Sequence, residues 1–387
     1  MKKIMFLAAV SMMSASAFAS KARLSALQNS ESVSNDFQDL FDKPNRMMTL
    51  SDQVTFEWGS PSLSYATGGT SGSSPNSEGG FLRSFGSSKM GAYIGRQSDN
   101  FTLLTSGGAL AAVQSQIGTQ WTTTTGRYLD NPFNIFYATK LGDMNFGASL
   151  YYANSSRRTS TQQSKNAQAL IVGLSDDVWE VTSTLSLGAQ VRDETTGTST
   201  SGDQIKGDSG LRLAGHYKMG TTKYYADYSI LSGTASTVAG NSSTKDGKLG
   251  ISSYNLGMES FFKGEGSHFF YGVAYRAYSE AQTGASHQSN GSKYETARIP
   301  LILGVEAEAS SWATVRGAVS QSILIDTEKV TSTGGSTTNS GMHDTTVTAG
   351  LGLKFQKMII DAVLAAGSSG QLNANSFGTN ASLTYMF

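Results

Sequence analysis

The sequence predicts an all-β fold in which antiparallel strands close into an up-and-down barrel. Two observations predict it: apolar residues recur at every second position in one segment after another, and the connections between these segments alternate between short and long. A helix would repeat its apolar face every 3.6 residues, whereas a strand sends successive side chains to opposite faces. We expect about sixteen strands, with fourteen as the alternative, because single-chain bacterial barrels have an even number.

The segment 343–356 shows the alternation most clearly. Val347, Leu351, Leu353 and Phe355 fall on one face, and small or polar residues occupy the positions between them. Strands of the same kind are predicted at 131–141, 144–154, 167–174, 180–192, 210–219, 223–231, 249–262, 268–279, 294–308, 312–325, 358–366 and 377–387. The remaining ones are 53–58 and a pair at 88–97 and 101–106. If that pair is a loop, the count falls to fourteen.

The lengths of the connections separate a barrel from a soluble sandwich. Short links lie near 142–143, 175–177, 220–222, 263–266, 310–311 and 356–357; long polar ones cover 155–165, 195–208, 233–247, 283–292 and 327–342. Short periplasmic turns and long extracellular loops are typical of transmembrane barrels in bacterial outer membranes. The order is kept hairpin after hairpin, which a sandwich has no reason to do. We therefore expect a transmembrane barrel.

Composition excludes several other classes. The chain has 38% hydrophobic residues, 43 Gly, 5 Pro, no Cys and a formal net charge of zero. A neutral chain lacks the basic face that a nucleic-acid partner would need. With no Cys and only four His, we expect no metal site and no cofactor, and the absence of nucleophile or phosphate-loop motifs predicts that the protein is not an enzyme.

The N-terminal residues predict export. Lys2 and Lys3 precede the apolar run 4–10, and Ala17-Phe18-Ala19 provides a small-x-small cleavage site before Ser20. This is the pattern of a secretory signal peptide, assigned to residues 1–19. Residues 20–50 then form a periplasmic N-terminal segment or a plug, and residues 51–387 form the barrel.

The C-terminal residues end in an amphipathic strand. Ala381, Leu383, Tyr385 and Phe387 share one face, and the chain stops on an aromatic residue. An edge strand of a soluble sandwich is the alternative. This ending resembles the C-terminal strand of Gram-negative outer-membrane β-barrels. The resemblance implies a location in the cell outer membrane, among lipid and lipopolysaccharide. It also implies that Leu383, Tyr385 and Phe387 are a signal read by the barrel-assembly machinery.

Aromatic residues gather near the short turns. Such rings favour the headgroup level of a bilayer, so they predict a periplasmic aromatic belt. The alternative is that aromatic residues are simply common in strands. The predicted belt consists of Tyr137, Phe146, Tyr217, Tyr224, Phe269, Trp312 and Phe355.

Charged residues in the strands are predicted to face inward, since a lipid-facing Arg or Lys at mid-membrane costs about 2–4 kcal/mol. The predicted pore-lining set is Lys140, Arg192, Arg212, Lys218, Arg276, Arg298, Arg316, Lys354, Asp227, Glu259, Glu306, Glu308 and Asp361. We expect a porin-like channel for passive diffusion of small hydrophilic solutes and ions, in which these residues set selectivity. Homotrimers are common among porins. The alternative is a closed polar core of paired charges.

Residues 22–45 carry a second resemblance. Ala22-Arg23-Leu24, then Val33 and Asp36, then Phe41-Asp42-Lys43-Pro44-Asn45 are similar to the N-terminal segment of the long-chain fatty-acid transporter superfamily. There an Ala-Arg start, a V-x-x-D stretch and a Phe-x-Asn-Pro-Ala ending supply a plug for a fourteen-stranded barrel. Here Lys43-Pro44-Asn45 replaces Asn-Pro-Ala, and the match covers only this segment. It implies a plugged transporter of hydrophobic ligands. A structural or adhesive surface barrel is a further alternative.

Overall fold

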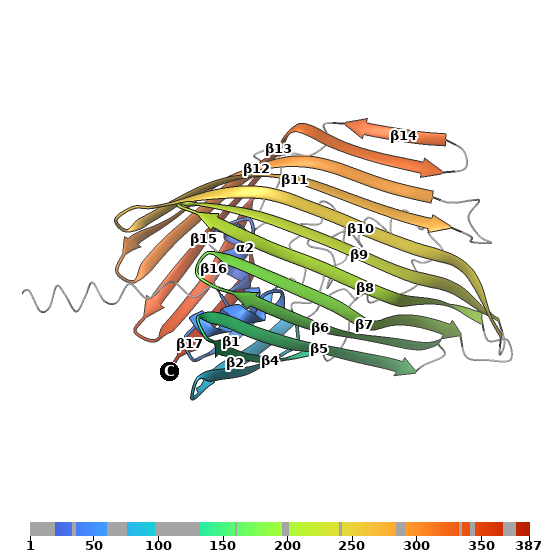
Figure 1. The fold of residues 1–387 in the computed structure, drawn as a ribbon, viewed down its shortest axis with the longest axis horizontal. Coiled ribbons are helices and arrows are strands. Elements are labelled where there is room, and N and C mark those ends of the chain that lie inside the picture. Colours follow the sequence, from blue (N-terminus) through green and yellow to red (C-terminus); the bar gives the residue numbers. More distant parts are fainter. Residues whose placement is uncertain are drawn as a thin grey trace, which may run out of the picture.

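The computed structural model describes residues 20–32, 36–59, 76–96, 132–158, 161–195, 201–239, 242–283, 292–332, 335–340, 345–366 and 377–387. The predicted signal peptide and the expected strand at 101–106 lie outside the described residues. Sixteen strands form a closed antiparallel barrel, and a seventeenth, β14, pairs only with the far end of β13 (Figure 1). The predicted fold class is confirmed.

The strands follow one another around the barrel in chain order, each paired with the next by antiparallel ladders. They are β1 (Gln53–Gly59), β2 (Asn76–Phe85), β3 (Ser88–Ile94), β4 (Phe133–Leu141), β5 (Met144–Arg158), β6 (Thr161–Ser175), β7 (Trp179–Thr195), β8 (Ser201–Met219), β9 (Thr222–Ala239), β10 (Ser242–Lys263), β11 (Ser267–Thr283), β12 (Ser292–Ser310), β13 (Ala313–Ser332), β14 (Gly335–Ser340), β15 (Thr346–Phe355), β16 (Met358–Ala366) and β17 (Phe377–Met386). After β13 the barrel continues with β15.

The last strand closes the barrel on the first. β17 pairs with β1 from Gln53↔Met386 to Gly59↔Asn380, and the backbone N–H of Phe387 donates to the carbonyl of Asp52 at 3.1 Å. Closure leaves no free sheet edge, so backbone groups find partners without water. Phe387 therefore lies at the seam of the barrel, at the end with the short turns (Figure 1).

Side chains alternate between the two faces of the wall. On β1, Thr55 and Glu57 point inward and are buried, whereas Phe56 and Trp58 point outward and are about half exposed. The same holds around the barrel, so the outer face is a band of exposed apolar side chains. This is the reverse of a soluble protein, in which large apolar patches are rarely exposed.

The structure corrects the assignment of two early strands. The sequence predicted a hairpin of 88–97 and 101–106, but β3 pairs with β2 across a tight turn at Gly86, which has a φ of 60°, and its other edge pairs with β4. The sequence of β2, Asn-Ser-Glu-Gly-Gly-Phe-Leu-Arg-Ser-Phe, carries glycines and polar residues in place of a regular apolar face. The period-two signal is therefore too weak to detect there.

The structure also shortens several predicted long loops. The β5–β6 ladder continues to Arg158↔Gln162 and the β9–β10 ladder to Ala239↔Ser242. Part of 155–165 and of 233–247 is therefore strand. Ser and Thr fit extended backbone without giving a segment an apolar face. These extensions are held by backbone hydrogen bonds between paired strands, and not by burial of an apolar face.

The N-terminal segment, residues 20–32 and 36–50, lies inside the barrel near the short turns (Figure 1). It contains the helix α2 (Lys21–Ala26) and two 3₁₀ helices, η1 (Gln38–Phe41) and η2 (Pro44–Thr49). Helix α2 contacts β13 and β15–β17, whereas η2 contacts β3–β6. None of the described helices is long and apolar enough to cross a membrane.

Candidate functional site

The N-terminal segment is held to the barrel wall by a buried chain of ion pairs. Arg23 of α2 binds Glu306 of β12 with Nε–Oε2 at 2.7 Å and Nη2–Oε1 at 3.0 Å. Arg316 of β13 binds the same Oε2 at 2.5 Å and Asp361 of β16 at 2.6 Å. The Arg316 side chain is 1% exposed. A bidentate Arg–carboxylate contact fixes the orientation of the two groups as well as pairing their charges, so α2 is held in one defined position.

The first residues of the segment face the neighbouring strands. The Ser20 hydroxyl donates to Asp361 Oδ2 at 3.2 Å and, as the N-cap of α2, accepts from the backbone N–H of Arg23. The backbone N–H of Lys21 donates to Glu57 of β1 at 3.0 Å, and its ammonium lies 2.6 Å from Glu78 of β2. α2 thus begins among carboxylates on three strands.

Farther along, Glu259 of β10 receives the turn after α2. It accepts from the Ser30 hydroxyl and from the backbone N–H of Ser32, both at 2.7 Å. Glu31 pairs with Lys43 at 2.5 Å, and Lys223 of β9 donates to the Glu31 carbonyl. Burial opposes ionisation of Glu31, but Lys43 and Lys223 prevail and lower its pKa to about 2.

The end of the segment carries a second set of ion pairs. Arg46 of η2 binds both oxygens of Glu180 on β7 at 2.8 Å, and Asp42 lies 3.0 Å from Arg212 of β8. Arg212 also binds Asp227 of β9 at 2.5 Å. Burial favours the neutral form of Asp42, but Arg212 outweighs it and lowers the pKa of that carboxyl. At this end of the segment, Arg46 and Asp42 therefore each meet a wall residue of opposite charge.

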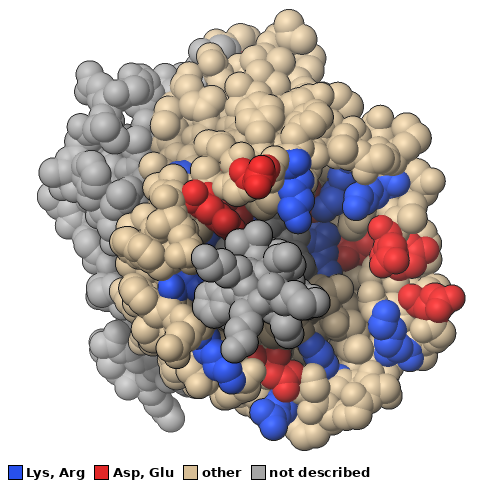
Figure 2. All heavy atoms as spheres, turned by 90° about the vertical axis from the view of Figure 1, so that its left-hand side faces the viewer, with Lys and Arg blue, Asp and Glu red and all other residues tan. Residues whose placement is uncertain are grey.

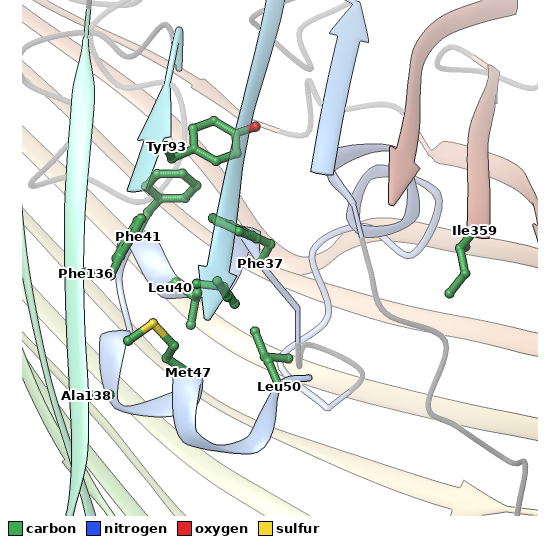
Figure 3. Packing of buried hydrophobic residues seen from close by; sticks show 10 residues of the cluster. Phe37, Leu40, Phe41, Met47, Leu50, Tyr93, Phe136, Ala138 and Ile359 are labelled. Carbon is green, nitrogen blue, oxygen red and sulfur yellow. The ribbon is translucent and has the colours of Figure 1, made fainter. Parts of the chain in front are cut away.

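Aromatic packing holds the same end of the segment (Figure 3). Phe37 and Phe41 lie against Tyr93 of β3 and Phe136 of β4, with ring centroids 5.0–6.0 Å apart. Leu40, Met47 and Leu50 complete this cluster and are at most 2% exposed. Figure 3 shows these side chains pointing toward one another from the segment and the wall. This apolar seat faces β2–β4.

Two glycines make room for the turn Pro44-Asn45. A Cβ on Gly147 of β5 would lie 2.1 Å from the backbone nitrogen of Asn45, and one on Gly173 of β6 would lie 2.0 Å from its Oδ1. The two glycines face each other in the β5–β6 ladder. The Asn45 amide donates to Ser175 at 2.9 Å and to Glu180 at 3.0 Å. The wall is therefore shaped to the backbone of the segment.

Six of the predicted pore-lining residues face inward and contact the segment or each other: Arg212, Arg316, Asp227, Glu259, Glu306 and Asp361. This closed, paired arrangement is the one that the sequence held open as an alternative for the lumen. Arg276 of β11 and Arg298 of β12 lie opposite each other in their ladder, and Arg298 is 3.5 Å from Asp326.

The other five predicted lining positions lie elsewhere on the strands. Lys140, Lys218 and Glu308 are exposed within the last residues of β4, β8 and β12, beside the short turns, and Lys354 is half-buried near the end of β15. Figure 2 shows charged side chains of both signs around the hollow at this end. Arg192 is on β7, opposite Ser164 of β6; the structure describes its backbone and not its side chain. A role in solute selectivity stays a prediction for all of them.

The predicted aromatic belt lies near the short turns. Trp312, Tyr217 and Phe355 are about half exposed, and Tyr137, Tyr224 and Phe269 are exposed to a similar degree. Phe146 is half-buried. Leu383, Tyr385 and Phe387 share the outward face of β17, with Tyr385 and Phe387 stacked edge to face at 5.8 Å. Their roles at a membrane interface and in assembly stay predictions.

One part of the inner wall is apolar. Tyr151 and Ala153 of β5 pack with Ala167, Ala169 and Ile171 of β6, on the face that Gly147 and Gly173 share. This patch adjoins the glycines that receive Pro44-Asn45, farther toward the long loops. It contrasts with the charged wall of β12–β16, where α2 is seated.

The sequence did not predict four of the charged residues that hold the segment. Glu31 and Arg46 belong to the segment itself, in a stretch without periodicity. Glu57 and Glu78 belong to the wall, on the short early strands β1 and β2. The one detectable signal was a glycine at the inward position of two consecutive strands, Gly147 and Gly173. Among the described residues, no group of His, Asp or Glu side chains could hold a metal ion.

Comparison with known proteins gives structural similarity only. The chain matches no protein-family model and no curated protein. Among solved structures it is similar to the CymD monoaromatic hydrocarbon channel (10% identity, 95% of this chain and 97% of that chain, TM-score 0.41) and to the Pseudomonas putida toluene transporter TodX (12%, 95% and 99%, 0.38). It is also similar to a loop-deletion mutant of the outer-membrane protein OmpT of Vibrio cholerae (13%, 87% and 97%, 0.33). These values do not place the chain in a family.

Proposed function

We propose that this chain is an outer-membrane transporter whose N-terminal segment plugs the lumen and must shift to let a ligand pass. The observation that carries the proposal is the buried set of ion pairs between the segment and the wall, centred on Arg23, Glu306 and Arg316. A segment docked by chance would not be expected to meet a side chain of opposite charge on β2, β7, β8 and β12. We call residues 20–50 the plug from here on.

The outer face supports a membrane location. Large apolar side chains, from Phe56 and Trp58 on β1 to Tyr385 on β17, are exposed all around the wall. Lipid is the environment in which such a surface is stable, and a closed barrel satisfies the backbone there. We assign the short-turn end to the periplasm. Lipid, lipopolysaccharide and the assembly machinery are the partners this location implies.

The apolar patch on β5 and β6 favours a hydrophobic cargo. Tyr151, Ala169 and Ile171 form a buried apolar cluster on the inner wall next to the turn Pro44-Asn45 of the plug. They are at most 1% exposed, so a ligand from the long-loop end would reach them only by displacing the chain that covers them. Small hydrophobic or amphipathic molecules fit this chemistry.

A second candidate function is the porin-like channel for small hydrophilic solutes and ions. Arg276 and Arg298 face each other on the inner wall beyond the plug, and charges of both signs line the short-turn rim. Such a wall suits water and ions. This channel would conduct only if the plug leaves or tolerates a continuous aqueous path, and it could be monomeric or a homotrimer.

Planar-bilayer conductance and uptake into liposomes separate the two functions. For the plugged transporter we expect little steady conductance from the intact protein, large steps after deletion of residues 20–50, and uptake of a labelled fatty acid or aromatic hydrocarbon. A large ohmic conductance from the intact protein, without uptake of hydrophobic ligands, would favour the porin. If neither form conducts or transports, a structural or adhesive role remains.

A further inference from the structure

The start of α2 faces a row of carboxylates on the inner wall. Glu78 of β2 is opposite Glu57 of β1, Glu57 is opposite Ser382 of β17, and Ser382 is opposite Asp361 of β16. Directly opposite residues in antiparallel ladders share a face, so all four side chains point into the lumen side by side. They are at most 6% exposed. Three acidic side chains are thus buried on four adjacent strands.

Acidic groups predominate in and beside this row. Among the described residues, the acids are Glu57, Glu78 and Asp361 with the nearby Glu306 and Asp36, and the cations that pair with them are Lys21, Arg23 and Arg316. Glu57 accepts its hydrogen bonds from two neutral groups, the backbone N–H of Lys21 at 3.0 Å and the side-chain amide of Gln38 at 2.7 Å. Burial of a carboxylate without an ion pair is destabilising.

Two buried acceptors in the same place also lack partners. Within the described part of the chain, Ser382 Oγ and Asn380 Oδ1 make no hydrogen bond, although these residues are 0% and 3% exposed. Buried polar atoms are normally hydrogen-bonded. Ser382 lies between Glu57 and Asp361 in the row. The wall therefore offers both charge and acceptors to a hydrogen-bond donor that carries a positive charge.

Ser20 is the residue of the plug that lies next to these acceptors. Its hydroxyl already reaches Asp361, and the N–H of the following residue reaches Glu57. The Ser20 nitrogen is attached to the Cα between these two contacts. In a chain that continues upstream, this nitrogen is a neutral amide. Hydrolysis of the Ala19–Ser20 bond by signal peptidase consumes one water, leaves a carboxylate on Ala19 and frees an amine on Ser20, which takes up a proton near neutral pH.

We propose that the α-ammonium group of Ser20, created by signal-peptide removal, binds in the carboxylate row between Glu57 and Asp361. Processing of the precursor thereby locks the plug. The ammonium brings three N–H donors and one positive charge to a row in which Glu57 otherwise accepts only from neutral groups. This inference rests on the proposed function, because it explains how the plug is held, and on the predicted cleavage after Ala19.

The test uses exported full-length protein with a single reporter cysteine, Ser25→Cys, since the natural chain has no Cys. Ser25 is 4% exposed in α2, so a maleimide should react slowly while the plug is seated. A second form keeps the signal peptide but carries five extra Gly and Ser residues between Ala19 and Ser20. This form has a neutral amide at Ser20. We expect its cysteine to react at least tenfold faster.

The variant Glu57→Gln separates charge from steric effects. In the extended form it removes the buried negative charge that the ammonium would otherwise meet, so we expect slow labelling to return. Glu265→Gln, in the exposed turn between β10 and β11, is the matched control and should not restore it. If Glu57→Gln fails to slow labelling of the extended form, or if the extended form labels as slowly as the natural one, the inference is wrong.

A direct measurement completes the test. Reductive methylation followed by mass spectrometry reports how fast the α-amine reacts in folded and in urea-unfolded protein. We expect strong protection in the folded form; equal rates would overturn the inference. Neither measurement depends on transport, so a failure of hydrophobic-ligand uptake would contradict the proposed function while leaving the seat of Ser20 intact.

Discussion

The two halves of the plug differ in how much apolar surface they bury. Helix α2 pairs Lys21 with Glu78 and Arg23 with Glu306, and packs only the small side chains of Ala22 and Ala26 against Val363. The half that contains η1 and η2 also has ion pairs, through Asp42 and Arg46, but adds a large aromatic and aliphatic cluster against β2–β4. We call the first the ionic half and the second the apolar half. Buried ion pairs require accurate geometry, and removal of one partner leaves the other charge buried without compensation. Apolar packing is more tolerant and loses free energy in proportion to the surface removed. A ligand could therefore loosen the apolar half while the ionic half keeps the plug attached.

The largest expected effect comes from breaking the ionic half at its centre. Arg316→Ala removes the cation that binds Asp361 and leaves Glu306 with Arg23 alone, so it should cost about 3–5 kcal/mol of plug seating. Every 1.4 kcal/mol is about tenfold, so labelling of Ser25→Cys should rise at least a hundredfold. Arg83→Ala is the matched control, because Arg83 lies on the exposed side of β2, 3.8 Å from Asp52 and over the ring of Phe387, both outside the plug. Unchanged labelling in Arg316→Ala would show that the ion pairs do not hold the plug.

The apolar half is tested by Phe41→Ala. This change removes a ring from the cluster with Tyr93 and Phe136, and burial of a Phe side chain is typically worth about 3 kcal/mol or more. We expect a reporter cysteine in η2 to react faster, whereas Ser25→Cys in α2 should respond much less. If both reporters respond equally, the two halves move as one unit.

Gly147→Ala should have a smaller effect on the same half. The added Cβ would meet the backbone of Asn45 at 2.1 Å, so the turn must shift, and overpacking of this kind typically costs about 1–3 kcal/mol. Gly250→Ala on β10 is the control, because a Cβ there meets nothing within 4 Å. We expect higher bilayer conductance for Gly147→Ala only. Equal conductance of the two variants would mean that the glycine seat does not control the path.

The smallest effect concerns pH. Burial, and then the charge of Asp39, raise the pKa of Asp36 well above its usual 3.8. A carboxyl whose pKa is raised on seating weakens seating as pH rises above 3.8 toward the folded pKa. Glu31 acts oppositely: its pKa falls to about 2, so its contribution is full above 4.5 and is lost as pH falls from 4.5 to 2.

Plug seating, measured by cysteine labelling, should therefore be strongest at mildly acidic pH. Asp36→Asn keeps an oxygen for the N–H groups of Gln38 and Asp39 and should flatten the decline on the alkaline side. The acid side, governed by Glu31, should stay as it was. If plug seating still weakens to the same extent at alkaline pH in Asp36→Asn, a group other than Asp36 causes the weakening.

The sequence predicted the barrel well because its signal is local. Alternation in segments such as 343–356 needs only neighbouring residues, and closure follows from the need to pair every strand edge. β2 was not predicted because its glycines leave no apolar face. The extensions of β5 and β9 were not predicted because Ser and Thr do not distinguish the inner face of a strand from the outer one.

The site was predicted only in part because it depends on pairing across the chain. The sequence shows that Arg316 and Asp361 belong inside a barrel, but not that they meet each other or Arg23. The contact between Arg23 and Glu306 joins residues 283 positions apart. Glu31 and Arg46 lie in an irregular segment, where no periodicity says which way a side chain points.

That separation has a consequence for the order of events during biogenesis. The residues of the plug are among the first of the mature chain to be exported, yet half of their seat belongs to β12–β17, the last strands to arrive. Contacts between residues so distant in sequence form late, since the intervening chain must first be ordered. A barrel that lacks its final strands has no Asp361 to receive Ser20 and no Arg316 to share Glu306. Helix α2 can therefore dock only after the wall has closed. In a truncated or misregistered barrel the N-terminal segment would stay undocked and accessible to proteases.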